Sequence, residues 1–327
     1  MQRPPIEAEG LVRRFGDIVA VAGIDLVVEP GEVFGFLGPN GAGKTTAVRM
    51  LTTLLRPTEG TARVAGFDVV RDAASVRRAI GVALQDAAID PLMTGRELLR
   101  LQAVLHGLTK AETAERSERL LQQVGLTGAA DRRVGQYSGG MRRRLDLALA
   151  LVHEPGVLFL DEPTTGLDPT SRLALWDELR RLNRDGTTVF LTTQYLDEAD
   201  ELATRIAIID GGRIVRDGTP GALKAAVGGH TLLVTVPEEQ HERVEQVLLG
   251  FGGSRPGKGR SLAIGLDGGP AAMAPVLRAL EDAGVTVEHL ELDAPSLDDV
   301  FAEATGRRLE GAGDPGVAGD PGLVEPA

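Results

Sequence analysis

The sequence predicts an α/β protein with a large amino-terminal domain and a small carboxy-terminal α/β domain. Five short apolar runs carry this prediction, at residues 33–37, 80–84, 157–160, 189–191 and 206–209. Runs of this length that do not alternate with polar residues are typical of strands buried on both faces of a parallel sheet. Helical patterns separate them, at residues 45–55, 94–106, 110–124, 140–152 and 171–183. Strands that alternate with helices along the chain indicate an α/β domain.

The charge and composition of the 327 residues exclude several classes of protein. Asp and Glu number 47 against 35 Lys and Arg, so at a net charge of −12 nothing draws the whole chain toward nucleic acid or anionic lipid. Aromatic residues make up only 3%, too few for a base-stacking platform, and the absence of cysteine excludes disulfides. No window of about 18 residues is uninterruptedly apolar, and residues 1–10 lack the core of a signal peptide. We therefore expect a cytoplasmic chain without a membrane span.

The composition changes after residues 218–220, which indicates a domain boundary. Beyond it, strand patterns at 231–236, 261–266 and 285–292 alternate with helical patterns at 238–249, 270–283 and 296–305. We expect one domain over residues 5–225 and a small α/β accessory domain over residues 230–305. Residues 306–327 hold two GDPG units and little apolar material, so we expect a disordered tail there.

The clearest motif in the chain follows the apolar run at 33–37. It consists of Gly38, Pro39, Asn40, Gly41, Ala42, Gly43, Lys44 and Thr45, with Thr46 next to them. The motif matches GxxxxGK[ST] and lies between an expected strand and an expected helix, as a phosphate-binding loop requires. Its glycines let backbone N–H groups surround phosphate oxygens, and the following helix presents its positive end to them. We expect Lys44 to reach the β- and γ-phosphates of a nucleotide and the Thr45 hydroxyl to bind Mg²⁺.

Two adjacent carboxylates, Asp161 and Glu162, end the apolar run at 157–160. Neighbouring residues of a strand point to opposite sides, so the two can have different roles. Asp161 suits the Mg²⁺ shell, directly or through water, and Glu162 suits the polarisation of an attacking water. An ordinary acidic turn after a strand is the alternative, and the phosphate loop upstream makes it the less favoured one.

A third motif opens the helix expected at 140–152. Ser138 is a natural N-cap, and Gly139 and Gly140 expose backbone N–H groups at a helix start, where a second anion can bind. Local chemistry alone favours a plain capped helix. The three arginines at 142–144 could form a nucleic-acid patch, but a solvated face of an acidic protein is the favoured interpretation.

In this order, the three motifs resemble the nucleotide-binding cassette of ABC transporters, a P-loop NTPase fold with a helical subdomain. The resemblance covers about residues 5–225 and places the helical subdomain at about 86–135. It implies that Phe15 stacks on adenine and that Gln85 contacts Mg²⁺ and senses a transmembrane partner. It also implies that Asp168 lies in the D-loop, at 165–169.

Two positions depart from the family pattern. Met141 stands where the signature usually has Gln, and Gln194 stands at the switch position that is normally His. Gln194 offers two donors and an acceptor, so we expect a catalytic role for it beside Lys44 and Glu162; a degenerate switch is the alternative. The segment at 192–200 is similar to the daunorubicin-resistance type of ATP-binding subunit, which serves antibiotic exporters. The segment at 297–301 is similar to part of that type's carboxy-terminal domain, although an ordinary amphipathic helix would have the same composition.

The resemblance implies an ATPase that uses ATP and Mg²⁺ to power efflux of a drug, an antibiotic or another hydrophobic compound. Because the chain holds one cassette, a second cassette is the expected partner, in a homodimer with ATP between the phosphate loop of one copy and Ser138 of the other. The pathway is expected from a separate transmembrane permease, with the chain peripheral on the inner face of the cell membrane and no nucleic acid bound. Residues 89–93 either dock that permease or simply pack within the subdomain. The alternatives are an importer cassette and a soluble ABC-type ATPase that acts on nucleic acid or ribosomes.

Overall fold

A six-stranded sheet forms the centre of the molecule in the computed structural model, which describes residues 3–84, 89–255, 260–266 and 269–307. Its strands run in the order β10-β9-β3-β8-β7-β6. Their bounds are β3 Val33–Leu37, β6 Ile80–Ala83, β7 Val157–Asp161, β8 Thr188–Thr193, β9 Arg205–Asp210 and β10 Arg213–Gly218. All neighbours are parallel except β10, which pairs with β9 in the antiparallel sense. The five predicted strands are confirmed, and all lie in this one sheet.

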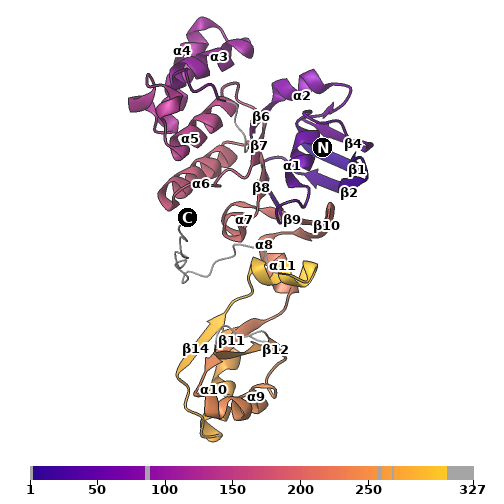
Figure 1. Cartoon of the computed structure of the whole chain (residues 1–327), viewed down its shortest axis with the longest axis vertical. Coiled ribbons are helices and arrows are strands. Elements are labelled where there is room, and N and C mark those ends of the chain that lie inside the picture. The colour runs from indigo at the N-terminus through magenta and orange to yellow at the C-terminus, as the bar shows by residue number, and fades with distance from the viewer. Residues whose placement is uncertain (1–2, 85–88, 256–259, 267–268, 308–327) are drawn as a thin grey trace, which may run out of the picture.

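Helices and a second sheet cover the two faces of the central sheet (Figure 1). On one face lie α3 Gly95–Leu105, α4 Lys110–Gln123, α5 Gly139–Ala150 and α6 Pro169–Arg184, whose apolar side chains pack with Leu158, Leu160 and Leu191 of the sheet. On the other face, α1 Lys44–Leu51 and α2 Ala73–Ala79 pack with Phe159 and Phe190. Side chains that alternate along β7 thus enter two separate cores, which is the reason for its continuous apolar sequence.

The antiparallel sheet beside α1 was not predicted. It contains β1 Ile6–Phe15, β2 Ile18–Val28, β4 Glu59–Val64 and β5 Phe67–Asp68, in the order β2-β1-β4-β5. Alternate residues of β2 and β4 are exposed, and register shifts interrupt the pairing of β1 with β2. The sequence of β4, EGTARV, therefore lacks the continuous apolar run that revealed the central sheet. β2 does begin with such a run, at residues 18–22, which sequence reasoning missed.

The carboxy-terminal part begins after α8 Pro220–Ala226 and forms a sheet with two helices. Its elements are β11 His230–Thr235, α9 His241–Leu248, β12 Ser254–Arg255, β13 Ser261–Leu266, α10 Met273–Asp282 and β14 His289–Asp293. The strands pair antiparallel in the order β12-β13-β11-β14, which is the split βαβ arrangement. The expected alternation of strands and helices after residue 230 is confirmed. Short 3₁₀ turns at Thr127–Ala129, Val134–Gln136, Glu238–Gln240 and Gly269–Ala272 complete the described elements.

The last helix, α11 Leu297–Thr305, packs away from the small sheet. Its residues Leu297, Val300 and Phe301 are buried in one core with Leu37 and Leu196 of the large domain. It contacts α7 Leu196–Leu202, α8 and β10, and lies between the two parts of the molecule (Figure 1). Proximity in sequence placed this helix with the small domain, whereas its apolar face joins the large one. Of the expected tail, only residues 306 and 307 fall within the described residues.

None of the helices in the described ranges combines the length and the apolarity that a bilayer span requires.

Candidate functional site

The phosphate-loop residues form a tight turn between β3 and α1. Gly41 and Gly43 have positive φ angles of 79° and 108°, which residues with a Cβ rarely adopt. A Cβ on Gly38 would lie 2.3 Å from the Ile209 carbonyl oxygen, and one on Gly43 would lie 2.4 Å from that of Ala20. Both glycines are therefore required for the close approach of the loop to β9 and β2.

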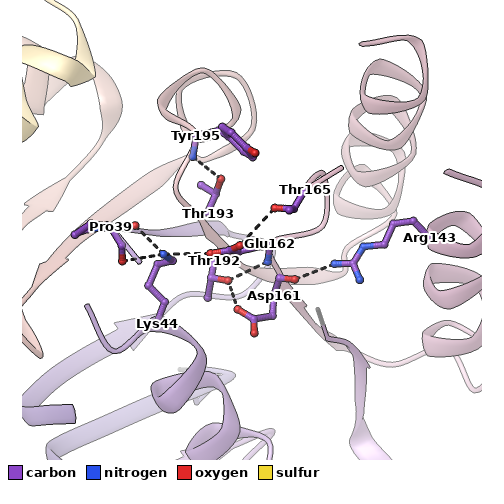
Figure 2. Close-up of polar contacts among 10 residues, drawn as sticks. Pro39, Lys44, Arg143, Asp161, Glu162, Thr165, Thr192, Thr193 and Tyr195 are labelled. Atoms are coloured by element: carbon purple, nitrogen blue, oxygen red, sulfur yellow. Dashed lines mark hydrogen bonds and ion pairs between the residues drawn. The ribbon is translucent and has the colours of Figure 1, made fainter. Parts of the chain in front are cut away.

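Lys44, the first residue of α1, turns its ammonium group back over this loop. Its Nζ donates to the carbonyl oxygens of Gly38 at 2.7 Å and Pro39 at 3.1 Å. It also lies 3.2 Å from Glu162 Oε1, and the two side chains are only 4% and 7% exposed. Burial lowers the pKa of Lys44, and the charge of Glu162 partly offsets this. Figure 2 shows these groups converging at the carboxyl ends of the strands.

The Asp161–Glu162 pair lies at the end of β7, next to the end of β8. Asp161 is buried, and its Oδ1 accepts a hydrogen bond of 2.5 Å from Thr192 Oγ1. Glu162 N donates to the carbonyl oxygen and the hydroxyl of Thr192, both at 3.1 Å. Glu162 Oε2 accepts from Thr165 Oγ1 at 3.4 Å. The two carboxylates thus point to different places, and only Glu162 contacts the ammonium group of Lys44.

The donor set fits a divalent cation. Asp161 Oδ2 is buried and has no hydrogen-bond partner, although a buried carboxylate oxygen normally has one. Thr45 lies in the first turn of α1, next to Lys44, and supplies a hydroxyl of the kind Mg²⁺ accepts. Gln85, the other expected ligand, lies outside the described residues.

The Ser-Gly-Gly motif opens α5 on the opposite face of the central sheet from α1. Ser138 caps the helix by accepting from Met141 N at 3.3 Å. Gly140 approaches the start of α6, where a Cβ would lie 2.8 Å from Ser171 Oγ. Asp168 caps α6 by accepting from Ser171 Oγ at 2.6 Å and from Ser171 N at 3.0 Å, and these hydrogen bonds lower the pKa of its carboxyl group. The motif and Asp168 are therefore close to each other but do not share the face of the sheet that α1 covers.

The remaining expected site residues differ in their exposure and in their contacts. Phe15 is 45% exposed at the end of β1, with the Arg13 guanidinium 4.4 Å from its ring centre. Thr46 lies in the first turn of α1. Gln194 follows β8, and no hydrogen bond joins it to Glu162 in the part of the chain that the structure describes. Of the loop at 89–93, Ile89 and Met93 pack against the helical subdomain, whereas Leu92 is 72% exposed.

Sequence reasoning missed one residue of this region, Arg143. It belongs to the three arginines that were expected to form a solvated face, but its side chain is only 12% exposed. Its guanidinium donates to backbone carbonyls beside the acidic pair. The helical period shows that the three arginines point to different sides of α5. It does not show which side faces the strand ends, because that depends on how the helix packs.

Comparison with known proteins identifies the family. A family model described as ABC transporter matches residues 21–165, and one described as the C-terminal domain of DrrA1-3-like ATP-binding proteins matches residues 218–305. Daunorubicin resistance ATP-binding protein DrrA2 of Streptomyces coeruleorubidus is 48% identical, over 93% of this chain and 96% of that protein. The chain is an ABC transporter ATP-binding protein.

Further relatives agree with this assignment. The daunorubicin/doxorubicin resistance ATP-binding protein DrrA of Streptomyces peucetius is 47% identical, over 92% of each chain. Among solved structures, an ATP-binding subunit of an ABC transporter covers 68% of this chain and 92% of its own, with a TM-score of 0.63 and 26% identity. A dimeric ATP-binding cassette in a post-hydrolysis state, bound to ADP and Pi, covers 65% and 98%, with a TM-score of 0.61 and 26% identity.

These findings confirm the predicted P-loop NTPase cassette fold and the family, whose members are ATPases that drive transport. Cassettes of this family bind ATP. The relatives are drug-resistance ATP-binding proteins, which supports the exporter type and favours neither the importer nor the nucleic-acid alternative.

Proposed function

We propose that this ABC cassette binds MgATP at the carboxyl ends of β3, β7 and β8 and hydrolyses it there. The observation that carries the proposal is the convergence of Lys44 with Asp161 and Glu162, three buried charged groups from two separate segments of the chain. Burying such groups is costly unless they are paired or serve a charged ligand. A triphosphate would take the place of Glu162 as the partner of Lys44, which frees the carboxylate.

Asp161 and Thr45 would hold the Mg²⁺ ion, together with Gln85 from the segment outside the described residues. Held by these ligands, a divalent cation would supply positive charge that offsets the negative charge of the phosphates. Asp161 offers the oxygen Oδ2 for this purpose, while Thr192 holds Oδ1 in place. The adenine is proposed to stack on Phe15, which is 45% exposed and whose ring already contacts the Arg13 guanidinium.

Glu162 is the proposed general base. Once Lys44 is engaged by phosphate, the Glu162 carboxylate can accept a proton from a water that attacks the γ-phosphate. Gln194, at the end of the neighbouring strand β8, is proposed to donate an amide hydrogen bond to the same region. The missing bond between Gln194 and Glu162 is compatible with this role, because catalytic contacts often tighten only when substrate binds.

Two copies of the cassette are proposed to enclose the nucleotide. Within one chain, the Ser138 helix start and the phosphate loop serve opposite faces of the sheet. A second anion-binding helix end for the same ATP would therefore come from a partner copy, with Ser138, Gly139 and Gly140 facing its γ-phosphate. The dimeric, ADP-bound cassette among the structural relatives supports this arrangement.

Hydrolysis is proposed to power export of a drug, an antibiotic or a similar hydrophobic compound through a separate membrane subunit. The names of the daunorubicin- and doxorubicin-resistance relatives support this cargo class. The chain would then work as a peripheral protein on the inner face of the membrane, and the exposed Leu92 is a proposed contact for the membrane subunit.

Nucleotide binding and turnover of two variants test the proposal. Lys44→Ala should lose MgATP hydrolysis, because Lys44 is the basic side chain of the phosphate loop. Glu162→Gln should still bind MgATP but turn over about 10²–10⁴-fold more slowly. Binding of a fluorescent ATP analogue and phosphate release would be measured with the membrane subunit present and absent. Wild-type hydrolysis by both variants would contradict the proposed site.

A further inference from the structure

Arg143 makes contacts that its place in the sequence does not suggest. It lies in the second turn of α5, between Arg142 and Arg144, yet it points inward to the ends of β6 and β7. Its Nη2 donates to the carbonyl oxygen of Asp161 at 2.9 Å, and its Nε donates to that of Pro163 at 2.9 Å. Its Nη1 donates to the carbonyl oxygen of Leu84 at 2.7 Å. One guanidinium group thus holds three backbone carbonyls.

Two of these carbonyls flank Glu162. The residue has a φ of +47°, in the left-handed region that non-glycine residues seldom occupy. Such a conformation persists only when the surroundings hold it from several sides. Thr192 holds the Glu162 N–H, and Arg143 holds the carbonyl of Asp161 (Figure 2). Arg143 also holds the carbonyl of Pro163, on the other side of Glu162. The third carbonyl, of Leu84, follows β6, which pairs with β7.

The charge of Arg143 is balanced nearby. Asp146, one turn along α5, lies 3.2 Å from Nη1, and both side chains are largely buried. Burial raises the pKa of Asp146 to about 6, and Arg143 counteracts this. A charge-assisted fork of this kind is stronger than neutral hydrogen bonds and fixes geometry as well as energy.

We propose that Arg143 is a positioning residue for hydrolysis, which fixes the backbone of Glu162 so that its carboxylate meets the attacking water. This inference rests on the proposed role of Glu162 as general base. It also ties α5, whose N-cap is Ser138, to the acidic pair, so that the start of this helix and Glu162 keep a fixed relative position within one chain. Neither Arg142, which is exposed, nor Arg144, which donates to the Val124 carbonyl, has these contacts.

The test compares Arg143→Gln with Arg142→Gln, its matched control on the same helix. ATPase rates and binding of a fluorescent ATP analogue would be measured on the full-length chain, alone and with the membrane subunit. Arg143→Gln should lower kcat about 10- to 100-fold, with KM and ATP affinity within about twofold of wild type. Arg142→Gln should match wild type. A wild-type kcat in folded Arg143→Gln, or an equal loss of ATP affinity, would overturn the proposal.

A double variant separates positioning from a general structural role. If Arg143 acts through Glu162, adding Arg143→Gln to Glu162→Gln should change the residual rate less than about twofold. A further loss as large as in the single variant would overturn the proposal. If Arg143→Gln does not fold, Arg143→Lys replaces it. This variant keeps the positive charge beside Asp146 but loses the guanidinium donors that hold the backbone carbonyls. Its kcat should be intermediate, whereas the kcat of Arg142→Lys should be unchanged. A wild-type chain no more active than Lys44→Ala would instead overturn the proposed ATPase site, and this inference with it.

Discussion

Removing Lys44 should destabilise the nucleotide-free protein more than neutralising its partner Glu162. The two charges are 3.2 Å apart and nearly inaccessible to solvent. At an effective dielectric constant of about 20, their attraction is about 5 kcal/mol, and removing one partner of a buried pair costs about 3–5 kcal/mol. Among the residues that the structure describes, Lys44→Ala leaves the Glu162 carboxylate with only Thr165 Oγ1, at 3.4 Å, as a hydrogen-bond donor. We therefore expect a loss of about 3 kcal/mol in the free energy of unfolding.

Glu162→Gln should cost less, about 1 kcal/mol, because the ammonium group keeps the carbonyls of Gly38 and Pro39 as acceptors. Lys224→Ala is the matched control: its pair with Asp200, at 2.7 Å, is much more exposed, so the loss should stay below about 1 kcal/mol.

Urea unfolding followed by tryptophan fluorescence measures these differences. Trp176 is the single tryptophan of the sequence and lies buried in α6, where its indole N–H donates to Glu198. Its emission therefore reports on the core of the cassette. The reasoning is refuted if Lys44→Ala unfolds at the same urea concentration as Lys224→Ala, or at a higher one than Glu162→Gln.

Three further outcomes are expected. Gln194→Ala should reduce ATPase activity at least about 10-fold with little change in ATP affinity, and Gln194→His should retain much of the activity; full activity in the alanine variant would remove Gln194 from the mechanism. Burial lowers the pKa of His153 from 6.5 to about 4, so the unfolded state binds the extra proton and stability falls as the pH drops from about 6.5 to about 4. His153→Gln should remove this loss. In urea titrations, the free energy of unfolding of the variant relative to that of wild type should therefore rise by on the order of 1 kcal/mol from pH 7 to pH 5. The same relative value at both pH values would contradict the prediction. Phe301→Ala should weaken the packing of α11 on the large domain by about 3 kcal/mol, so amide hydrogen exchange should become faster in α11 but not in β3. Equal acceleration in both elements would show that α11 does not detach independently of the large domain.

The sequence alone determined the features that depend on neighbouring residues. A strand buried on both faces is continuously apolar, so β3, β6, β7, β8 and β9 could be located within a few residues. The phosphate loop could be found because its glycines, Lys44 and Thr45 must occur at fixed spacing for the backbone to turn. The order of the motifs then carried the family resemblance.

Tertiary structure alone decided which of several similar residues has a special role. Three consecutive arginines look equivalent in the sequence, and only the packing of α5 against the ends of β6 and β7 selects Arg143. The pairing of Lys44 with Glu162 joins segments more than a hundred residues apart, so no local pattern predicts it. The pairing of β1 with β4 and the attachment of α11 to the large domain likewise depend on partners distant in the chain. Burial, strand register and charge pairing are properties of the folded chain, because each depends on which segments come into contact when the chain folds.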